Sequence, residues 1–325
     1  MKKIIPALTI ATVTASLLAA CGSSPSNSDE DGKLQIYTST FATAAIAKEI
    51  GGTDVQVELI VPPGADPHSY EPTPKQLTTI AKGDLFLLTG TTLEPYSEKI
   101  KESLAGNSIR FVETSKNIDL LEASASLHTH EEDAHDDHDD HDDHEAEEES
   151  HDHGQYDPHV WLDPNNAKKM ADSITTALAK EAPDRKETFD KNLALFNKQA
   201  DELDQNLQKA VDSGSKKELL VTHAAYGYLA ERYGFTQLPI AGISPSDEPS
   251  QKQLAAIVKE AEMHDLNYIA FEETVSPKVA RVIQKEIGAE SITIHNLESV
   301  AKDQQDQTYF DLMNENVTTL KQALQ

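Results

Sequence analysis

The chain lacks the features of a disulfide-linked, membrane-embedded or nucleic-acid-binding protein. Cys21 is its only cysteine, which excludes a disulfide bond within the chain. Lysine and arginine number 28 against 56 acidic residues, and the net charge of −28 argues against nucleic acid or an anionic membrane surface as a partner, since both require basic surface. Hydrophobic residues make up 38% of the 325 residues, enough for the cores of two domains but not for a bundle of membrane helices.

The N-terminus is typical of a secretory signal peptide, which we place at residues 1–20. Two lysines follow the first methionine, and the mostly apolar stretch after them is too short to span a membrane comfortably. The alternative is an N-terminal membrane anchor. Residues 18–22, LAACG, resemble the lipobox of bacterial lipoproteins, and the resemblance implies cleavage before Cys21 and lipid attachment to its sulfur. Residues 21–32 are then a polar, flexible tether.

Two runs of alternating strand and helix patterns predict an α/β fold with mainly parallel sheets. The first run has strand patterns at 34–38, 55–61, 85–88 and 109–112 and helix patterns at 41–50, 74–81, 93–104 and 165–180. The second has strand patterns at 218–222, 237–241, 268–271 and 292–294 and helix patterns at 226–233, 250–264, 277–287 and 309–324.

A long helical pattern separates the two runs. Its apolar residues recur at helical spacing from 184 to about 212, and ~29 helical residues would span roughly 43 Å. We therefore expect a first lobe at 33–183, a linking helix at 184–213 and a second lobe at 214–325.

Residues 123–156 interrupt the first lobe with a different composition. Between His128 and His153 there are eight histidines and fourteen acidic residues but no lysine or arginine, so the segment cannot bury a core and is expected to be disordered without a ligand. The histidines are His128, His130, His135, His138, His141, His144, His151 and His153. Their repeats with Asp-Asp spacers favour a weak, multivalent zinc-binding loop over the alternative of an acidic linker.

Three further histidines lie at strand ends or in loops, where α/β proteins bind ligands. His68 lies in the sequence GADPHSYEP, in a loop whose four prolines restrict the backbone. His159 lies in DPHVWLDP, beside the only tryptophan, Trp161, which we expect to pack inward. Asp157 or Asp163 is a candidate hydrogen-bond partner of its imidazole. His223 ends a strand pattern.

The motifs G-x-D-P-H-x-Y-x-P, D-P-H-x-W-L-D-P and T-H-x-x-Y resemble those of the zinc and manganese solute-binding proteins of bacterial ABC transporters, over residue 33 to the C-terminus. The resemblance implies two similar α/β lobes joined by one long rigid helix, with the metal between them. It also implies that His68, His159 and His223 are metal ligands. The fourth would be Glu298, in the loop after strand 292–294, where many relatives have Asp. A water molecule is the alternative fourth ligand, and Glu272 and Glu273 are reserve candidates.

The third histidine bears on the choice of metal. Manganese-binding members of the family generally place a carboxylate where this chain has His223. Three imidazoles and one carboxylate suit four-coordinate Zn²⁺ better than Mn²⁺, which prefers more oxygen ligands. The sequence therefore predicts Zn²⁺ as the bound ion, with manganese as the alternative.

The predicted function is the capture of Zn²⁺ outside the cytoplasm by a monomer anchored to the membrane through Cys21. Delivery would be to the membrane permease of an ABC importer with a cytoplasmic ATPase. A secreted zinc hydrolase is disfavoured because the chain has no H-E-x-x-H helix and no evident general base. A surface zinc buffer or adhesin, in which the His-rich loop is the working part, is the other alternative.

Overall fold

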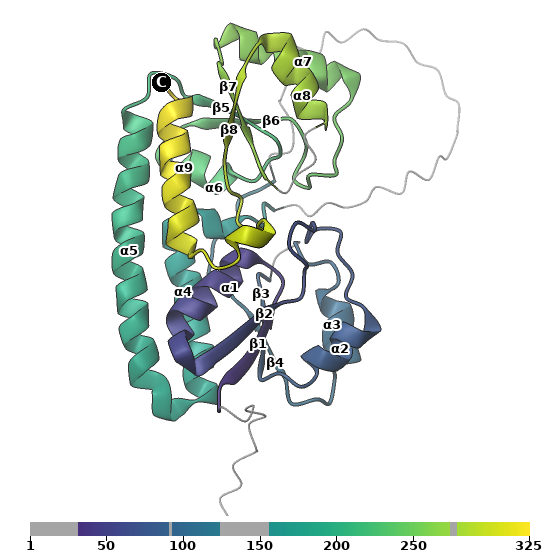
Figure 1. Cartoon of the computed structure of the whole chain (residues 1–325), viewed down its shortest axis with the longest axis vertical. Helices are drawn as coiled ribbons and strands as arrows, with labels where there is room; N and C mark the ends of the chain where they lie inside the picture. The colour runs from purple at the N-terminus through teal and green to yellow at the C-terminus, as the bar shows by residue number, and fades with distance from the viewer. Residues whose placement is uncertain (1–31, 91–92, 124–155, 274–277) are drawn as a thin grey trace, which may run out of the picture.

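The computed structural model describes residues 32–90, 93–123, 156–273 and 278–325, in which two four-stranded sheets form (Figure 1). The first sheet contains β1 (Leu34–Thr38), β2 (Val55–Leu59), β3 (Leu85–Leu88) and β4 (Arg110–Glu113), in the order β2-β1-β3-β4. The second contains β5 (Glu218–Val221), β6 (Thr236–Pro239), β7 (Tyr268–Phe271) and β8 (Glu290–Thr293), in the equivalent order β6-β5-β7-β8. All neighbouring strands are parallel, which confirms the prediction of two similar α/β lobes.

The helices lie close to the positions that the sequence pattern predicted. They are α1 (Phe41–Gly51), α2 (Pro74–Ile80), α3 (Ser97–Ser103), α4 (Pro164–Glu181), α5 (Lys186–Asp212), α6 (Gly227–Tyr233), α7 (Gln251–Met263), α8 (Lys278–Ile287) and α9 (Tyr309–Ala323). The exception is α3, predicted from residue 93. Pro95 disfavours helical backbone at Glu94, and the buried Glu94 carboxylate instead accepts two backbone N–H groups just after β3, at 3.0 and 3.2 Å.

Each sheet is covered by helices on both faces (Figure 1). One face of the first sheet packs on α2 and α3, and one face of the second on α7 and α8, each with its own apolar cluster. The opposite faces share a single larger cluster with α1, α4, α5, α6 and α9. This common core joins the two sheets and limits how freely they can move relative to each other.

The helix α5 runs alongside both halves of the molecule (Figure 1). It has 27 residues, which corresponds to a length of about 40 Å. Its apolar side is buried at Phe189, Phe196, Leu203 and Leu207 and packs on α4, α1 and α9. The helix is thus held on its inner side over much of its length, as a long rigid connection between the two sheets requires.

The last helix, α9, packs back onto elements of the first half. The Tyr309 hydroxyl donates to the Trp161 backbone oxygen at 2.7 Å, and the Tyr309 backbone N–H donates to Glu49 on α1 at 3.2 Å. Burial outweighs the hydrogen bond from the Tyr309 N–H and, with a smaller contribution from the negative charge of Asp311, raises the pKa of Glu49 to about 7. The protein therefore holds a carboxyl group at this junction that resists ionisation.

We expect the substitution Glu49→Gln to stabilise the metal-free protein at pH 8. The Glu49 carboxyl group has a pKa of 4.5 in the unfolded chain and about 7 in the folded chain. Between these two pH values the folded chain binds one proton more than the unfolded chain, so the free energy of unfolding falls as pH rises. Glutamine removes this cost, at most about 3 kcal/mol, and its amide oxygen still accepts the Tyr309 N–H. Melting temperatures at pH 4 and pH 8 test this. A gain at pH 8 no larger than at pH 4 would contradict it.

Several predicted features lie outside the described residues. These are the signal peptide, Cys21 with nearly all of its tether, and the eight histidines from His128 to His153. The bridge between Glu122 and Tyr156 pairs the two chain ends that flank residues 124–155. Within the described residues, none of the helices has the length and apolar character needed to cross a membrane.

Candidate metal centre

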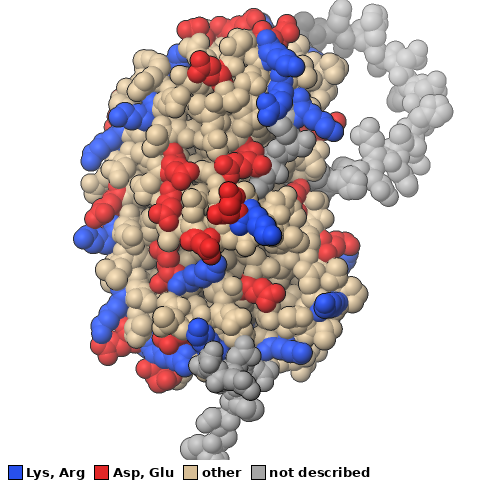
Figure 2. Space-filling view, viewed as in Figure 1, with Lys and Arg blue, Asp and Glu red and all other residues tan. Residues whose placement is uncertain are grey.

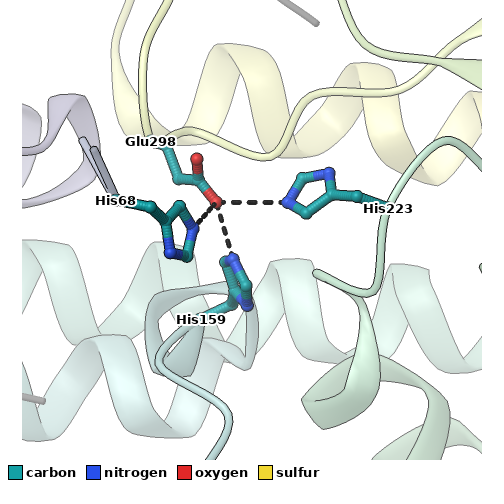
Figure 3. Close-up of side chains that lie close together, drawn as sticks. All are labelled: His68, His159, His223 and Glu298. Atoms are coloured by element: carbon teal, nitrogen blue, oxygen red, sulfur yellow. Dashed lines mark hydrogen bonds and ion pairs between the residues drawn. The ribbon is translucent and has the colours of Figure 1, made fainter. Parts of the chain in front are cut away.

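Four side chains named from the sequence meet where the carboxyl ends of the two sheets approach each other (Figure 3). His68 lies in the loop after β2, His223 lies two residues after the end of β5, and Glu298 lies in the loop after β8. His159 comes from the turn that precedes α4. One ligand atom from each lies within 4.8 Å of all the others, so the four form one group of metal-ligand atoms.

The three imidazoles converge on a single carboxylate oxygen (Figure 3). The distances from Glu298 Oε1 to Nε2 are 2.6 Å for His159, 3.3 Å for His223 and 3.4 Å for His68. Tetrahedral ligands about 2.0–2.1 Å from a zinc ion lie roughly 3.3 Å apart. The arrangement therefore suits a small four-coordinate ion, provided that the Glu298 carboxylate moves slightly away from His159 to lengthen the 2.6 Å distance between them.

The loop that carries Glu298 is fixed by the N-terminus of α1. The backbone N–H groups of Phe41 and Ala42 donate to the carbonyl oxygens of Glu298 and Leu297, both at 2.9 Å. Leu297 is buried and has a φ of +58°, a left-handed conformation that costs a branched residue energy. The N–H groups at the start of α1 thus help to hold a strained turn that points the Glu298 side chain into the site.

The segments of His68 and His159 are positioned by short hydrogen-bonded turns. The His68 N–H donates to the Asp66 carboxylate at 2.8 Å. Trp161 is fully buried, as predicted, and its indole N–H donates to the Asn296 carbonyl oxygen at 2.7 Å. The tryptophan therefore links the turn of His159 to the loop of Glu298.

Two buried carboxylates orient the imidazoles from behind. Asp157 contacts Nδ1 of His159 at 2.7 Å, whereas Asp163, the other candidate from the sequence, accepts the backbone N–H of Asn165 at the start of α4. Glu272 contacts Nδ1 of His223 at 2.8 Å. Because each carboxylate holds Nδ1, Nε2 of both rings is left to face the centre of the site.

The role of Glu272 was not predicted. The sequence offered Glu272 and Glu273 as reserve ligands, but Glu273 is exposed and Glu272 lies behind His223. Thr222 donates to Glu272 at 2.7 Å and Asn296 donates to it at 2.9 Å. The sequence did contain a signal for this contact. Glu272 follows β7 and His223 follows β5, and adjacent parallel strands end at the same edge of a sheet.

The charges of the site are strongly coupled. Burial alone would lower the pKa of His159, but Asp157 and Glu298 raise it to about 9. Against the same effect of burial, Glu272 and Glu298 raise the pKa of His223 to about 10. Burial would raise the pKa of Glu298, yet the imidazoles of His68, His159 and His223 hold it well below its usual range. Without an ion, protonated imidazoles balance the carboxylates, and a divalent cation must replace these protons.

The site is almost closed to solvent. His159 and His223 are completely buried and Glu298 is 3% exposed, whereas the His68 side chain is 10% exposed. The His68 loop is exposed over residues 62–64. A path for an ion to and from the site is therefore expected on the side of this loop.

The two remaining described histidines lie apart from the site. His264 follows the last turn of α7, where its side chain is 36% exposed and 3.5 Å from Glu260. His295 contacts Glu315 on α9 at 2.8 Å. Each of them contacts a nearby glutamate, and neither belongs to the group of four ligand atoms.

The chain matches a family model over most of its length. The family is described as zinc-uptake complex component A, periplasmic, and its model matches residues 36–323. The high-affinity zinc uptake system protein ZnuA of Bacillus subtilis (strain 168) is 37% identical over 313 residues, which cover 95% of this chain and 94% of that protein. The zinc-binding lipoprotein AdcA of Streptococcus pneumoniae is 32% identical over 99% of this chain, which spans 61% of that relative's length.

Solved structures share the same two-lobed arrangement. A zinc(II)-bound mutant variant of AdcAII from Streptococcus pneumoniae aligns with a TM-score of 0.76 at 29% identity, covering 91% of this chain and all of that one. The laminin-binding protein Lmb of Streptococcus agalactiae, described as a bifunctional protein with adhesin and metal transporting activity, aligns with a TM-score of 0.76 at 28% identity, over 90% of this chain and all of that one.

Proposed function

This chain belongs to the family of periplasmic zinc-uptake complex component A proteins, and we propose that it captures Zn²⁺ in the His68–His159–His223–Glu298 site for delivery to the membrane permease of an ABC importer. The observation that carries the proposal is the convergence of three Nε2 atoms on one carboxylate oxygen. The ion is the cargo of this protein. Its capture requires the protonated imidazoles to give up their protons and, together with the Glu298 carboxylate, to form bonds to zinc instead.

The proposed capture begins at the exposed side of the site. Zinc reaches His68 first, and the buried His159 and His223 then exchange their protons for the ion. Asp157 and Glu272 keep the two rings aligned throughout, because each remains bonded to Nδ1. Glu298 completes the set and carries the negative charge that a divalent ion needs in a buried site.

Zinc is preferred to manganese in this proposal because of the donor set. Three nitrogen ligands and one carboxylate offer few oxygen atoms, and Mn²⁺ favours oxygen ligands. The zinc names of the family and of its relatives support the same assignment. A manganese-binding subunit of the same transporter type remains the alternative.

The family serves zinc uptake outside the cytoplasm, and we propose no enzymatic activity for this chain. We further propose that Cys21 carries a lipid that anchors a monomeric protein to the cell membrane. The lipobox-like sequence around Cys21 supports this, and so does the lipoprotein name of the relative AdcA. The eight histidines between residues 128 and 153 are proposed to be an accessory zinc-binding loop.

We expect the chain without residues 128–153 to bind one zinc ion as tightly as the chain that contains them. The test is a competition titration with zinc and manganese of metal-stripped protein that starts after Cys21. The deletion should remove only weaker zinc ions, because the four proposed ligands of the fixed site all lie outside this segment. Loss of tight binding on deletion would favour the surface buffer instead. A preference for manganese would overturn the metal assignment and leave the transport role standing.

A further inference from the structure

Tyr228, a buried residue of α6, holds the chain on both sides of residues 124–155. Its hydroxyl donates to the backbone oxygen of Asp157 at 2.9 Å and accepts the backbone N–H of Leu121 at 3.1 Å. The Asp157 N–H in turn donates to the Leu121 carbonyl oxygen at 2.8 Å. One hydroxyl from the second half of the molecule therefore fixes the two stretches of chain that flank this segment of the first half.

Asp157 connects Tyr228 to the proposed ligand His159. One of its carboxylate oxygens, Oδ1, contacts Nδ1 of His159 at 2.7 Å and accepts the His159 backbone N–H at 2.9 Å. The backbone oxygen of the same residue is the atom that Tyr228 holds. Because Asp157 is bonded to both, a displacement of the Tyr228 hydroxyl would reach the imidazole through a single intervening residue.

The glycine that precedes Tyr228 lies against the other carboxylate oxygen of Asp157. A Cβ atom at Gly227 would be 2.5 Å from Oδ2 of Asp157, much closer than non-bonded atoms pack. The backbone of Gly227 does not have a positive φ, so the close approach, and not the backbone conformation, requires glycine here. Gly227 thus leaves the space in which the Asp157 carboxylate turns toward His159.

We propose that Gly227 and Tyr228 are positioning residues through which α6 holds Asp157, and with it His159, in the geometry that binds zinc. The two residues act on different parts of Asp157, one on its carboxylate and one on its backbone. The proposed ligand that lies nearest in sequence to residues 124–155 is thereby oriented by the second half of the chain. The inference deepens the proposed function and rests on it, since it assumes that His159 binds zinc.

The first test compares Tyr228→Phe with Tyr233→Phe, a matched change on the same helix. The Tyr233 hydroxyl donates to Asp204 on α5 at 2.8 Å and does not contact Asp157. Zinc affinity of the full chain is measured with chelator-buffered metal, at free zinc low enough to leave the weaker sites of the His-rich segment empty. We expect Tyr228→Phe to weaken zinc binding by about tenfold, the lower end of the loss typical for a residue that supports a ligand. Tyr233→Phe should leave zinc affinity unchanged.

A double-mutant cycle tests whether Gly227 acts through the carboxylate. Gly227→Ala should also weaken zinc binding by about tenfold, because the new methyl group displaces Oδ2 of Asp157. Alanine is the better helix former, so the change does not weaken α6 itself. In a chain that already carries Asp157→Ala, Gly227→Ala should cause no further loss of zinc affinity, since the methyl group then meets no carboxylate.

Nuclear magnetic resonance of the chain with one zinc ion per protein separates positioning from a general structural effect. An imidazole N–H bonded to a carboxylate gives a proton signal far downfield, and Nδ1–H of His159 and of His223 should each give one. Tyr228→Phe should shift or broaden only the signal that Asp157→Ala abolishes. The signal of His223, whose partner is Glu272, is the internal control.

The outcomes distinguish this inference from zinc capture itself. Unchanged zinc affinity in Tyr228→Phe, an equal loss in Tyr233→Phe or equal changes in both imidazole signals would each overturn the role of Tyr228. A loss from Gly227→Ala that persists beside Asp157→Ala would overturn the role of Gly227. All of these results leave zinc capture in place. Failure of the unmodified chain to bind zinc tightly would overturn both proposals.

Discussion

Replacing His223 with alanine is expected to weaken zinc binding by more than about 100-fold, since even the loss of a residue that only supports a ligand typically costs 10–100-fold. His223 is completely buried, and its Nε2 lies 3.3 Å from Glu298 Oε1. Alanine removes one of three nitrogen ligands and leaves a cavity in front of Glu272. A water molecule in this cavity would be a poor replacement for imidazole as a zinc ligand. The measurement is a chelator competition at fixed pH with the metal-stripped chain.

The matched control for this substitution is His264→Ala. His264 is also a histidine of the second half of the chain, but it lies at the end of α7 and is 36% exposed. Its removal should leave zinc affinity unchanged. If His223→Ala bound zinc within about threefold of the unmodified chain, well below the 10–100-fold expected for a supporting residue alone, the assignment of His223 as a ligand would be wrong.

Zinc affinity is expected to rise steeply with pH, by about 100-fold for each pH unit between pH 7 and pH 8. His159 and His223 have pKa values of about 9 and about 10 in the metal-free protein, so both carry a proton throughout this range. Zinc binds only the neutral imidazole, and each ion must therefore release two protons. Acid favours the protonated, metal-free site, so zinc affinity falls as pH falls. The rise of zinc affinity with pH should level off above pH 10, where both imidazoles are neutral even without zinc.

Titration calorimetry in two buffers of different ionisation enthalpy counts the protons released per zinc. We expect close to two at pH 7.5 for the unmodified chain. Asp157→Asn removes a charge that raises the pKa of His159, so this variant should release closer to one proton and show a shallower pH dependence. Release of fewer than one proton by the unmodified chain would show that the two imidazoles are already neutral before zinc binds.

The local pattern of the chain was sufficient to predict the secondary structure. Strand and helix periodicities located the elements within a few residues, because apolar spacing reflects which face of an element is buried. The prediction was wrong at the start of α3, where Glu94 turns inward to accept two N–H groups after β3. These hydrogen bonds of Glu94 outweigh the helical pattern of residues 93–96. They cannot be predicted from the spacing of apolar residues.

The sequence also identified the four residues that the structure brings together. His68 and His223 follow strands, and the carboxyl ends of parallel strands are where α/β proteins bind ligands. His159 was singled out together with them, as a histidine in a loop. Glu298, and the metal-ligand roles of all four residues, came from the family resemblance. The metal-ligand role of the four remains a proposal, and so do the lobe boundaries at 183 and 213.

By itself the amino-acid sequence determined the class of fold, the residue types available to a metal and the acidic, His-rich composition of residues 123–156, because each is a property of local order along the chain. Only the tertiary structure decided which carboxylate supports which imidazole and how the N-terminus of α1 holds the strained turn at Leu297. Apart from the contact of Asp157 with His159, two residues away, these features depend on contacts between distant residues, such as Glu272 with His223 and Phe41 with Glu298. Such contacts form only when the two sheets are packed on their common core, which no local pattern encodes.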